Sequence, residues 1–219
     1  MMVKVVRVKI CGLMRLSDVR AAVESGADAL GFVVASPNSR RNLSISKAKK
    51  LVKSVPVFAS KVAVTSSYDG KTLRKICAGL NPDALQLHRP THKTTLEVRK
   101  ERPELELILA TPVRDKSSVV EAKKASQYSD AILADSLGAD SMGGTGRTHD
   151  WNLTAMIREE IFPHPLILAG GLTADNVRLA IMKVRPYAVD VSTGVETRIG
   201  VKDAMKIRGF IRNAKETLA

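Results

Sequence analysis

The first apolar run of the chain reads Val5-Val6-Arg7-Val8-Lys9-Ile10 and is followed directly by Cys11-Gly12. A short run of Val and Ile that ends at a glycine predicts a buried β-strand. Parallel α/β proteins carry their functional groups where a strand gives way to a loop. Cys11 is therefore a candidate functional thiol, although a free cysteine is equally suited to be a small buried hydrophobe. The tetrapeptide Lys9-Ile10-Cys11-Gly12 leaves both interpretations open.

The same pattern recurs along the chain, with an apolar run followed by an amphipathic segment. The apolar runs predict strands at residues 5–10, 29–34, 61–65, 84–87, 105–110, 131–134, 166–169 and 188–191. The amphipathic segments predict helices that begin near Ser17, Ser46, Asp69, His92, Asp115, Asn152, Thr173 and Val201. Several of these residues have side-chain oxygens that can cap the first free amides of a helix.

The alternation of strands and helices decides the fold class. Near-continuous apolar strands predict a sheet that is buried on both faces, and the intervening helices predict right-handed crossovers between parallel strands. Eight such units favour an α/β fold of one domain, a (β/α)8 TIM barrel spanning residues 1–219. An open, doubly wound sheet is the alternative.

Composition narrows the class of protein. With 219 residues and 44% hydrophobic content, one domain can bury a substantial core. We expect a cytoplasmic protein, because no apolar stretch approaches membrane-spanning length and the N-terminus lacks a signal-peptide pattern. Cys11 and Cys77 have no metal-ligand spacing, so we expect two free thiols, with Cys77 in the core.

The net charge of +13 raises the question whether the protein binds nucleic acid. The basic residues are spread over most predicted helices and aromatic residues are 4%, so we expect no nucleic-acid partner.

Polar residues and glycines stand at nearly every predicted strand end, where packing does not explain them. Gly170-Gly171 follows the seventh strand and Ser192-Thr193-Gly194 follows the eighth. Loops there commonly bind phosphate through backbone amides in this fold, which makes these residues candidate phosphate ligands. Gly144, in the glycine-rich loop after the sixth strand, is a further candidate. The alternative is that Gly170-Gly171 only permits a tight turn with positive φ. The loop Gly143–Gly146 does not fit a P-loop, since Ser141 and Arg147 stand where Gly and Lys are required.

The motifs taken together resemble the phosphoribosylanthranilate isomerases of tryptophan biosynthesis, over nearly the whole chain. The matching stretches are Val8–Gly12, Glu24–Phe32, Ala84–His88, Gly143–Trp151, Leu168–Leu172 and Val189–Glu196. They occur in the order that the family shows. The resemblance implies a single-domain barrel of the ribulose-phosphate-binding type. One departure is the end of the third strand, Val62–Ser67, where an apolar wall of the anthranilate pocket is expected to differ.

The resemblance also implies an Amadori rearrangement of N-(5-phosphoribosyl)anthranilate without cofactor or metal. Asp135 matches the general acid and Cys11 the general base, while Arg41 matches the residue that engages the anthranilate end. Asp190 matches the residue that holds a sugar hydroxyl. His88 lines the site at most, and a packing histidine is an equal interpretation. The resemblance implies that the partner is a small phosphosugar and that the protein does not contact a membrane. The protein is expected to be a monomer or a homodimer.

The roles of base and acid require Cys11 to lose its proton and Asp135 to keep its proton. A thiol becomes a usable base when a nearby cation such as Arg40, Arg41 or Lys9 favours the thiolate. Asp135 needs the opposite, a pKa raised by burial or by a neighbouring negative charge, and a helix cap or loop salt bridge is its plainer interpretation. Two other functions stay open. One is a different phosphosugar barrel, such as an epimerase or indole-forming synthase, and the other is a non-catalytic basic binding protein.

Overall fold

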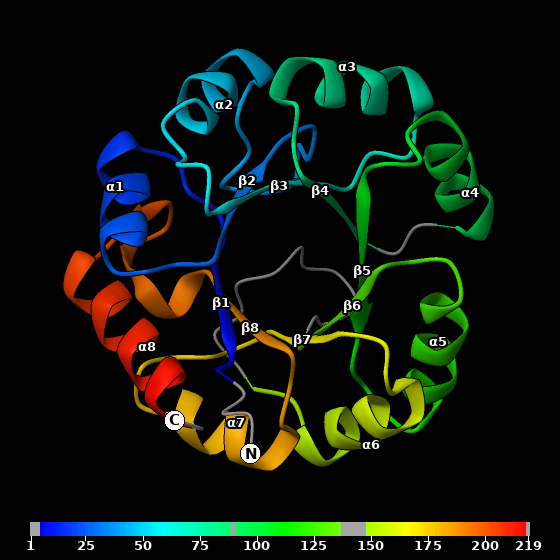
Figure 1. Ribbon diagram of the computed structural model, residues 1–219, viewed down its shortest axis with the longest axis vertical. Coiled ribbons are helices and arrows are strands. Elements are labelled where there is room, and N and C mark those ends of the chain that lie inside the picture. The colour runs from blue at the N-terminus through cyan, green and yellow to red at the C-terminus, as the bar shows by residue number, and fades with distance from the viewer. Residues whose placement is uncertain (1–4, 89–90, 137–147, 218–219) are drawn as a thin grey trace.

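The chain folds into a closed barrel of eight parallel strands with helices around it (Figure 1). The structure is a computed structural model that describes residues 5–88, 91–136 and 148–217. The barrel strands are β1 (Arg7–Ile10), β2 (Ala29–Val33), β3 (Ser60–Thr65), β4 (Ala84–His88), β5 (Glu106–Pro112), β6 (Ala131–Asp135), β7 (Leu166–Leu168) and β8 (Ala188–Val191). The barrel closes because β1 pairs in parallel with both β2 and β8. The predicted TIM barrel is confirmed, and the open sheet is wrong.

The helices follow the strands in the predicted order. They are α1 (Leu16–Glu24), α2 (Ile45–Val52), α3 (Gly70–Leu80), α4 (His92–Glu101), α5 (Ser117–Ser126), α6 (Trp151–Ile161), α7 (Val177–Val184) and α8 (Ala204–Glu216). Asp69 caps α3 as predicted, with its carboxylate accepting from the amides of Lys71 and Thr72. The caps of α2 and α6 are Ser44 and Asp150, so the predicted starts at Ser46 and Asn152 lie within those helices.

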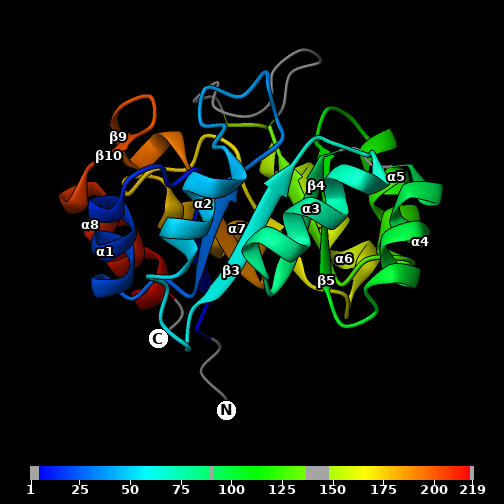
Figure 2. The same cartoon turned by 90° about the horizontal axis from the view of Figure 1, so that it is seen from above.

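The helix starts predicted near Thr173 and Val201 are too early, since α7 begins at Val177 and α8 at Ala204. A 3-10 turn (Thr193–Val195) follows β8, and the chain then forms a small antiparallel pair, β9 (Glu196–Arg198) and β10 (Val201–Lys202). Helix α8 begins only after Asp203, whose carboxylate caps it. Figure 2 shows β9 and β10 at the end of the barrel to which the arrow of β3 points. The small pair therefore belongs to the end that carries the strand termini.

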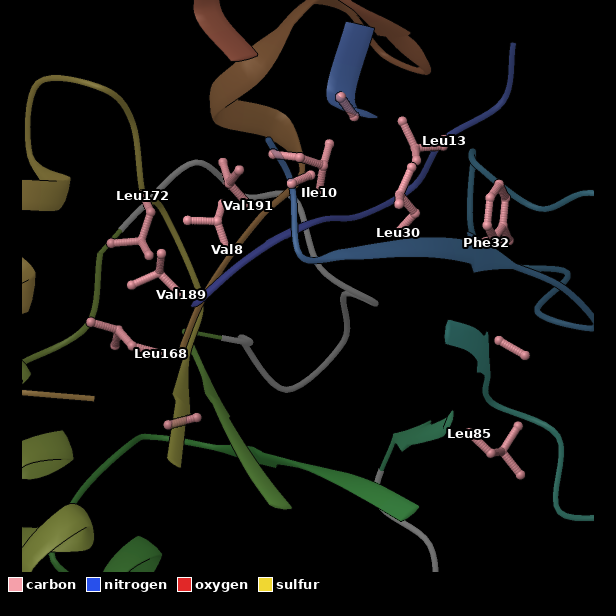
Figure 3. Close-up of a cluster of buried hydrophobic side chains, with 14 of the residues drawn as sticks. Val8, Ile10, Leu13, Leu30, Phe32, Leu85, Leu168, Leu172, Val189 and Val191 are labelled. Carbon is pink, nitrogen blue, oxygen red and sulfur yellow. The ribbon is translucent and has the colours of Figure 1, made fainter. Parts of the chain in front are cut away.

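Alternate residues of each strand face opposite sides of the barrel wall. The outward-facing set packs beneath the helices, and Figure 3 shows Val8 and Ile10 of β1 near Val189 and Val191 of β8. The inward-facing set is smaller in volume: Cys11, Val33, Val62, Val64, Ala84, Ile108, Ala110, Ala131, Leu133, Ile167, Ala169 and Ala188. Burial of each large aliphatic side chain contributes about 2 kcal/mol to the free energy of folding, so both layers stabilise the barrel.

The described part of the chain contains no helix that combines the length and apolarity needed to cross a membrane. Both cysteines are free and buried. Cys77 lies on the inner side of α3 within the main core, as expected.

Candidate active site

One pocket gathers the candidate residues that were predicted from different parts of the sequence. Its lining includes Cys11, Arg41, His88, Asp135, Gly170, Gly171, Asp190, Ser192, Thr193 and Gly194. Gly144 and most of the loop 138–149 lie outside the described residues. Val33, Val64 and Leu172 add apolar lining. An apolar wall is thus kept at the end of β3, where Val64 faces the pocket.

Cys11 directly follows β1 and lies two residues after Lys9, so both side chains enter the barrel. The Lys9 ammonium donates to Oδ1 of Asp190 at 2.8 Å, and the two residues are register partners in β1 and β8. A Cβ on Gly31 would lie 2.8 Å from Sγ of Cys11 and 3.2 Å from Cε of Lys9. Gly31 of β2 therefore leaves the room in which the thiol and the lysine stem lie together.

The protonation of Cys11 is set by opposing effects. Burial raises the pKa of the Cys11 thiol above its ordinary value and Asp190 adds to the rise, while Lys9 and Lys202 lower it. The cation expected from the sequence is present, but burial outweighs it, so the unliganded protein holds Cys11 mainly as a thiol. Burial also opposes charge on Lys9, yet Asp190 and Cys11 prevail and raise the pKa of Lys9. Lys9 is thus a permanent cation beside the thiol.

Asp135 ends β6 on another side of the same pocket. Burial, followed by the nearby carboxylate of Asp190, raises the pKa of Asp135 to about 6, although Ser136 and Lys9 act in the opposite direction. A carboxyl group with this pKa retains its proton in a useful fraction of molecules near neutral pH. The raised pKa that a general acid requires is present.

The glycine loops after β7 and β8 touch each other. Gly170 and Gly171 have φ values of 84° and 65°, so the turn itself requires glycine. A Cβ on Gly194 would lie 1.9 Å from the carbonyl oxygen of Leu172. Within the described residues, the amide groups of Gly171, Thr193 and Gly194 donate to no protein acceptor. Unpaired amides in adjoining loops form a cradle suited to an anion.

Arg41 belongs to a buried ion network. Its Nε and Nη2 donate to the two carboxylate oxygens of Glu196 at 2.8 and 2.7 Å, and Nη2 also donates to Thr193 Oγ1 at 3.1 Å. Lys202 contacts the same carboxylate at 2.9 Å. Burial favours the neutral form of Glu196, but Arg41 and Lys202 prevail and lower its pKa. Glu196 is therefore ionised and fixes the Arg41 guanidinium at the pocket.

His88 lies at the end of β4, with its Nε2 3.4 Å from Nε2 of the buried Gln86. The hydroxyl of Tyr68 donates to the backbone oxygen of His88. Both His88 and Gln86 line the pocket, so His88 is a lining residue. Among the described residues, no three His, Cys, Asp or Glu side chains gather in a way that could hold a metal ion.

A family model for N-(5'-phosphoribosyl)anthranilate isomerase matches residues 8–213 of this chain. The chain belongs to this family. The isomerase of Methanothrix thermoacetophila is 43% identical over 209 residues, which are 95% of this chain and 98% of that protein. The crystal structure of the Thermotoga maritima isomerase is 37% identical with a TM-score of 0.86, covering 96% of this chain and 98% of that one.

A further crystal structure shows a phosphoribosylanthranilate isomerase in complex with reduced 1-(o-carboxyphenylamino)-1-deoxyribulose 5-phosphate. It is 35% identical to this chain with a TM-score of 0.83, and it covers 96% of this chain and 98% of its own. Family membership agrees with the resemblance read from the motifs. A different phosphosugar barrel and a basic binding protein are therefore wrong as the function.

Sequence reasoning did not single out Lys202 or Gln86 as site residues, and it used Glu196 only as part of a motif. For Gln86 a signal was available, because period-2 alternation places it on the same face as His88. For Lys202 the sequence gives no local signal. Its segment was predicted as part of the last helix, so the turn that brings Lys202 back to the end of β8 was not expected.

We expect Gly194→Ala to weaken phosphosugar binding. The new methyl group would meet the Leu172 backbone oxygen at 1.9 Å, and only separation of the two glycine loops relieves the clash. The KM for the substrate should rise about tenfold or more, as a charge-assisted amide contact is lost. Gly209→Ala in α8 is the control, since its Cβ would meet Ala174 at an ordinary 3.7 Å. An unchanged KM in Gly194→Ala would show that the loops bind no phosphate.

Proposed function

We propose that the pocket carries out the Amadori rearrangement with Asp135 as general acid and Cys11 as general base. The reaction is that of the family, an aldose–ketose isomerisation in tryptophan biosynthesis. It converts N-(5-phospho-β-D-ribosyl)anthranilate to 1-(2-carboxyphenylamino)-1-deoxy-D-ribulose 5-phosphate. One observation supports the roles most strongly: a carboxyl group with a pKa of about 6 and a buried thiol line a single cavity that ends in two glycine loops.

The proposed steps involve only proton transfers and electron shifts within the substrate. Asp135 donates its proton to the ribose ring oxygen while the C1–O bond breaks and the anthranilate nitrogen forms a double bond to C1. Cys11 then removes the proton from C2 of this iminium ion, which gives an enol-amine. Uptake of a proton at C1 and loss of the proton from the C2 hydroxyl, which returns to the Asp135 carboxylate, yield the ketone. The reaction therefore needs no oxidant, cofactor or metal.

The iminium ion also gives a reason why Cys11 loses its proton during the reaction. In the unliganded protein the raised pKa of the thiol and the pKa of Asp135 allow only a small minority of molecules to hold both groups in their working forms. Once the ring has opened, the positive charge on the substrate lies next to Cys11 and favours the thiolate. The same charge makes the C2 proton more acidic.

Each remaining candidate residue is proposed to bind a different part of the substrate. The cradle of Gly170, Gly171 and Ser192–Gly194 is proposed to bind the phosphate. Arg41, held by Glu196, is proposed to engage the anthranilate carboxylate, which its planar guanidinium matches. Asp190, fixed by Lys9, is proposed to hold a sugar hydroxyl. His88 contributes to the wall, and Gly144 remains a further candidate phosphate ligand.

Cys11→Ala tests the role of the base. Turnover of freshly generated phosphoribosylanthranilate, followed by its fluorescence, should fall about 10²- to 10⁴-fold because no other group at that position removes the C2 proton. Cys77→Ala is the matched control, because it removes the other thiol at a core position of α3 away from the pocket. It should lose some stability and keep its turnover. Near-native turnover in Cys11→Ala would remove Cys11 from the mechanism.

We also infer a single domain over residues 1–219, located in the cytoplasm, with no nucleic-acid or membrane partner. A monomer or a homodimer is proposed. A solved Thermotoga maritima structure shows monomers generated from a dimeric phosphoribosylanthranilate isomerase, which supports both forms as folded states.

A further inference from the structure

Lys202 is a fully buried lysine to which the proposed mechanism assigns no step, although its charge adds to that of Lys9 in lowering the pKa of Cys11. It lies on β10, and its ammonium donates to the Ser192 carbonyl oxygen at 2.9 Å, to Ser192 Oγ at 3.2 Å and to Glu196 Oε1 at 2.9 Å. An ammonium group has three protons, and each of these has an acceptor. Lys202 therefore has no proton left for a ligand, and any effect on one must pass through Ser192 or Glu196.

The backbone at Ser192 has an unusual conformation. Its φ of −123° and ψ of −75° belong to neither a strand nor a helix, so Ser192 marks the turn between β8 and the 3-10 turn. In a planar trans peptide the carbonyl oxygen of Ser192 and the amide of Thr193 point in opposite directions. Because Lys202 holds the carbonyl, the Thr193 amide is turned to the other side. Thr193 and Gly194 line the pocket and belong to the glycine cradle.

The charge of the buried network is not balanced without a ligand. Arg41 and Glu196 already form a bidentate pair with no net charge. Lys202 adds a second cation to the same carboxylate, and burial lowers its pKa although Glu196 opposes this. A buried excess cation is costly unless an anion arrives. A phosphate in the adjoining cradle would supply that anion.

We propose that Lys202 is a positioning residue for the phosphate of the substrate. It holds the Ser192 peptide so that the amides of Thr193 and Gly194 face the phosphate, and it places one unbalanced positive charge behind them. The proposal rests on the proposed function only in taking a phosphosugar as the ligand. The ligand chemistry is a phosphate ester or inorganic phosphate, which share the same oxygens.

Lys202→Met tests the proposal because methionine fills a similar volume without charge or donors. Glu196 keeps Arg41 as its partner, so the variant should fold. We expect the KM for phosphoribosylanthranilate and the calorimetric Kd for inorganic phosphate each to rise about tenfold, while kcat stays within about threefold. Lys206→Met is the matched control. It removes the same charge from an exposed lysine that binds the Glu196 carbonyl, not Ser192, and it should change neither constant.

A fall in melting temperature with unchanged KM and phosphate Kd would overturn the proposal and leave Lys202 a structural residue. Equal losses in Lys202→Met and Lys206→Met would also overturn it, since the cause would then be net charge alone. If Lys202→Met does not fold, Lys202→Gln takes its place. Glutamine retains a donor, so its phosphate Kd should rise by less than the tenfold expected for Lys202→Met. Phosphate binding is measured without turnover, so failure of the assigned acid and base would be seen separately in Cys11→Ala.

Discussion

Asp135→Asn is expected to lose turnover about 10²- to 10⁴-fold, because asparagine has no proton to give to the ring oxygen. The geometry of the pocket should survive, since an amide has the shape of the carboxyl group. The loss should fall on kcat and on kcat/KM together, as the proton transfer is made only in the transition state.

The same variant is expected to be more stable than the parent near neutral pH. The folded-state pKa of Asp135 is about 6, above the ordinary value of 3.8, so folding favours the protonated carboxyl. The stabilisation that the proton brings is fully present below pH 3.8 and is lost as the pH rises through about 6. Ionisation then costs the parent about 3 kcal/mol that asparagine does not lose.

Denaturant unfolding of both proteins from pH 4 to pH 7.5 measures this difference, together with turnover at each pH. The stability advantage of Asp135→Asn should grow as the pH rises. Asp175→Asn is the matched control, because Asp175 is exposed after β7 and the variant makes the same replacement of a carboxyl group by an amide. A stability difference that is constant over this range would contradict the raised pKa, and retained turnover would contradict the acid.

Glu196→Gln is expected to destabilise the protein by about 3–5 kcal/mol, because it leaves the buried cations Arg41 and Lys202 without an anionic partner. The side chains of Glu196 and Lys202 are 3% and 0% exposed, so water does not replace the lost charge. Arg41 and the Ser192 loop should also lose their positions, and the KM should rise.

The exposed ion pair of Arg74 and Glu101 provides the control. Its side chains are 59% and 45% exposed, and Glu101→Gln should change the free energy of unfolding by less than about 1 kcal/mol. Both variants make the same chemical change, so urea unfolding isolates the effect of burial. A similar small cost in Glu196→Gln would mean that the two cations find other partners.

Part of the site could be predicted from sequence because the barrel brings strand ends together. Residues 11, 88, 135, 170 and 192 are far apart along the chain, yet each ends a strand of one parallel sheet or follows it within two residues. Period-2 alternation also places Lys9 with Cys11. The last helix forms as α8, but its predicted start near Val201 is too early, because Val201 and Lys202 first pair with β9. That pairing depends on contacts with the site that no local pattern carries.

The sequence by itself favoured the barrel and the end at which the site lies, because these follow from periodic patterns that each element carries locally. The candidate acid, base and glycine loops came from the resemblance of its motifs to the family. Only the tertiary structure decided that Glu196 joins Arg41 to Lys202, that Gly31 makes room for Lys9 beside Cys11, and that burial raises the pKa values of Cys11 and Asp135. Electrostatic effects depend on distances between residues remote in sequence and on the exclusion of water, and neither exists before the barrel closes.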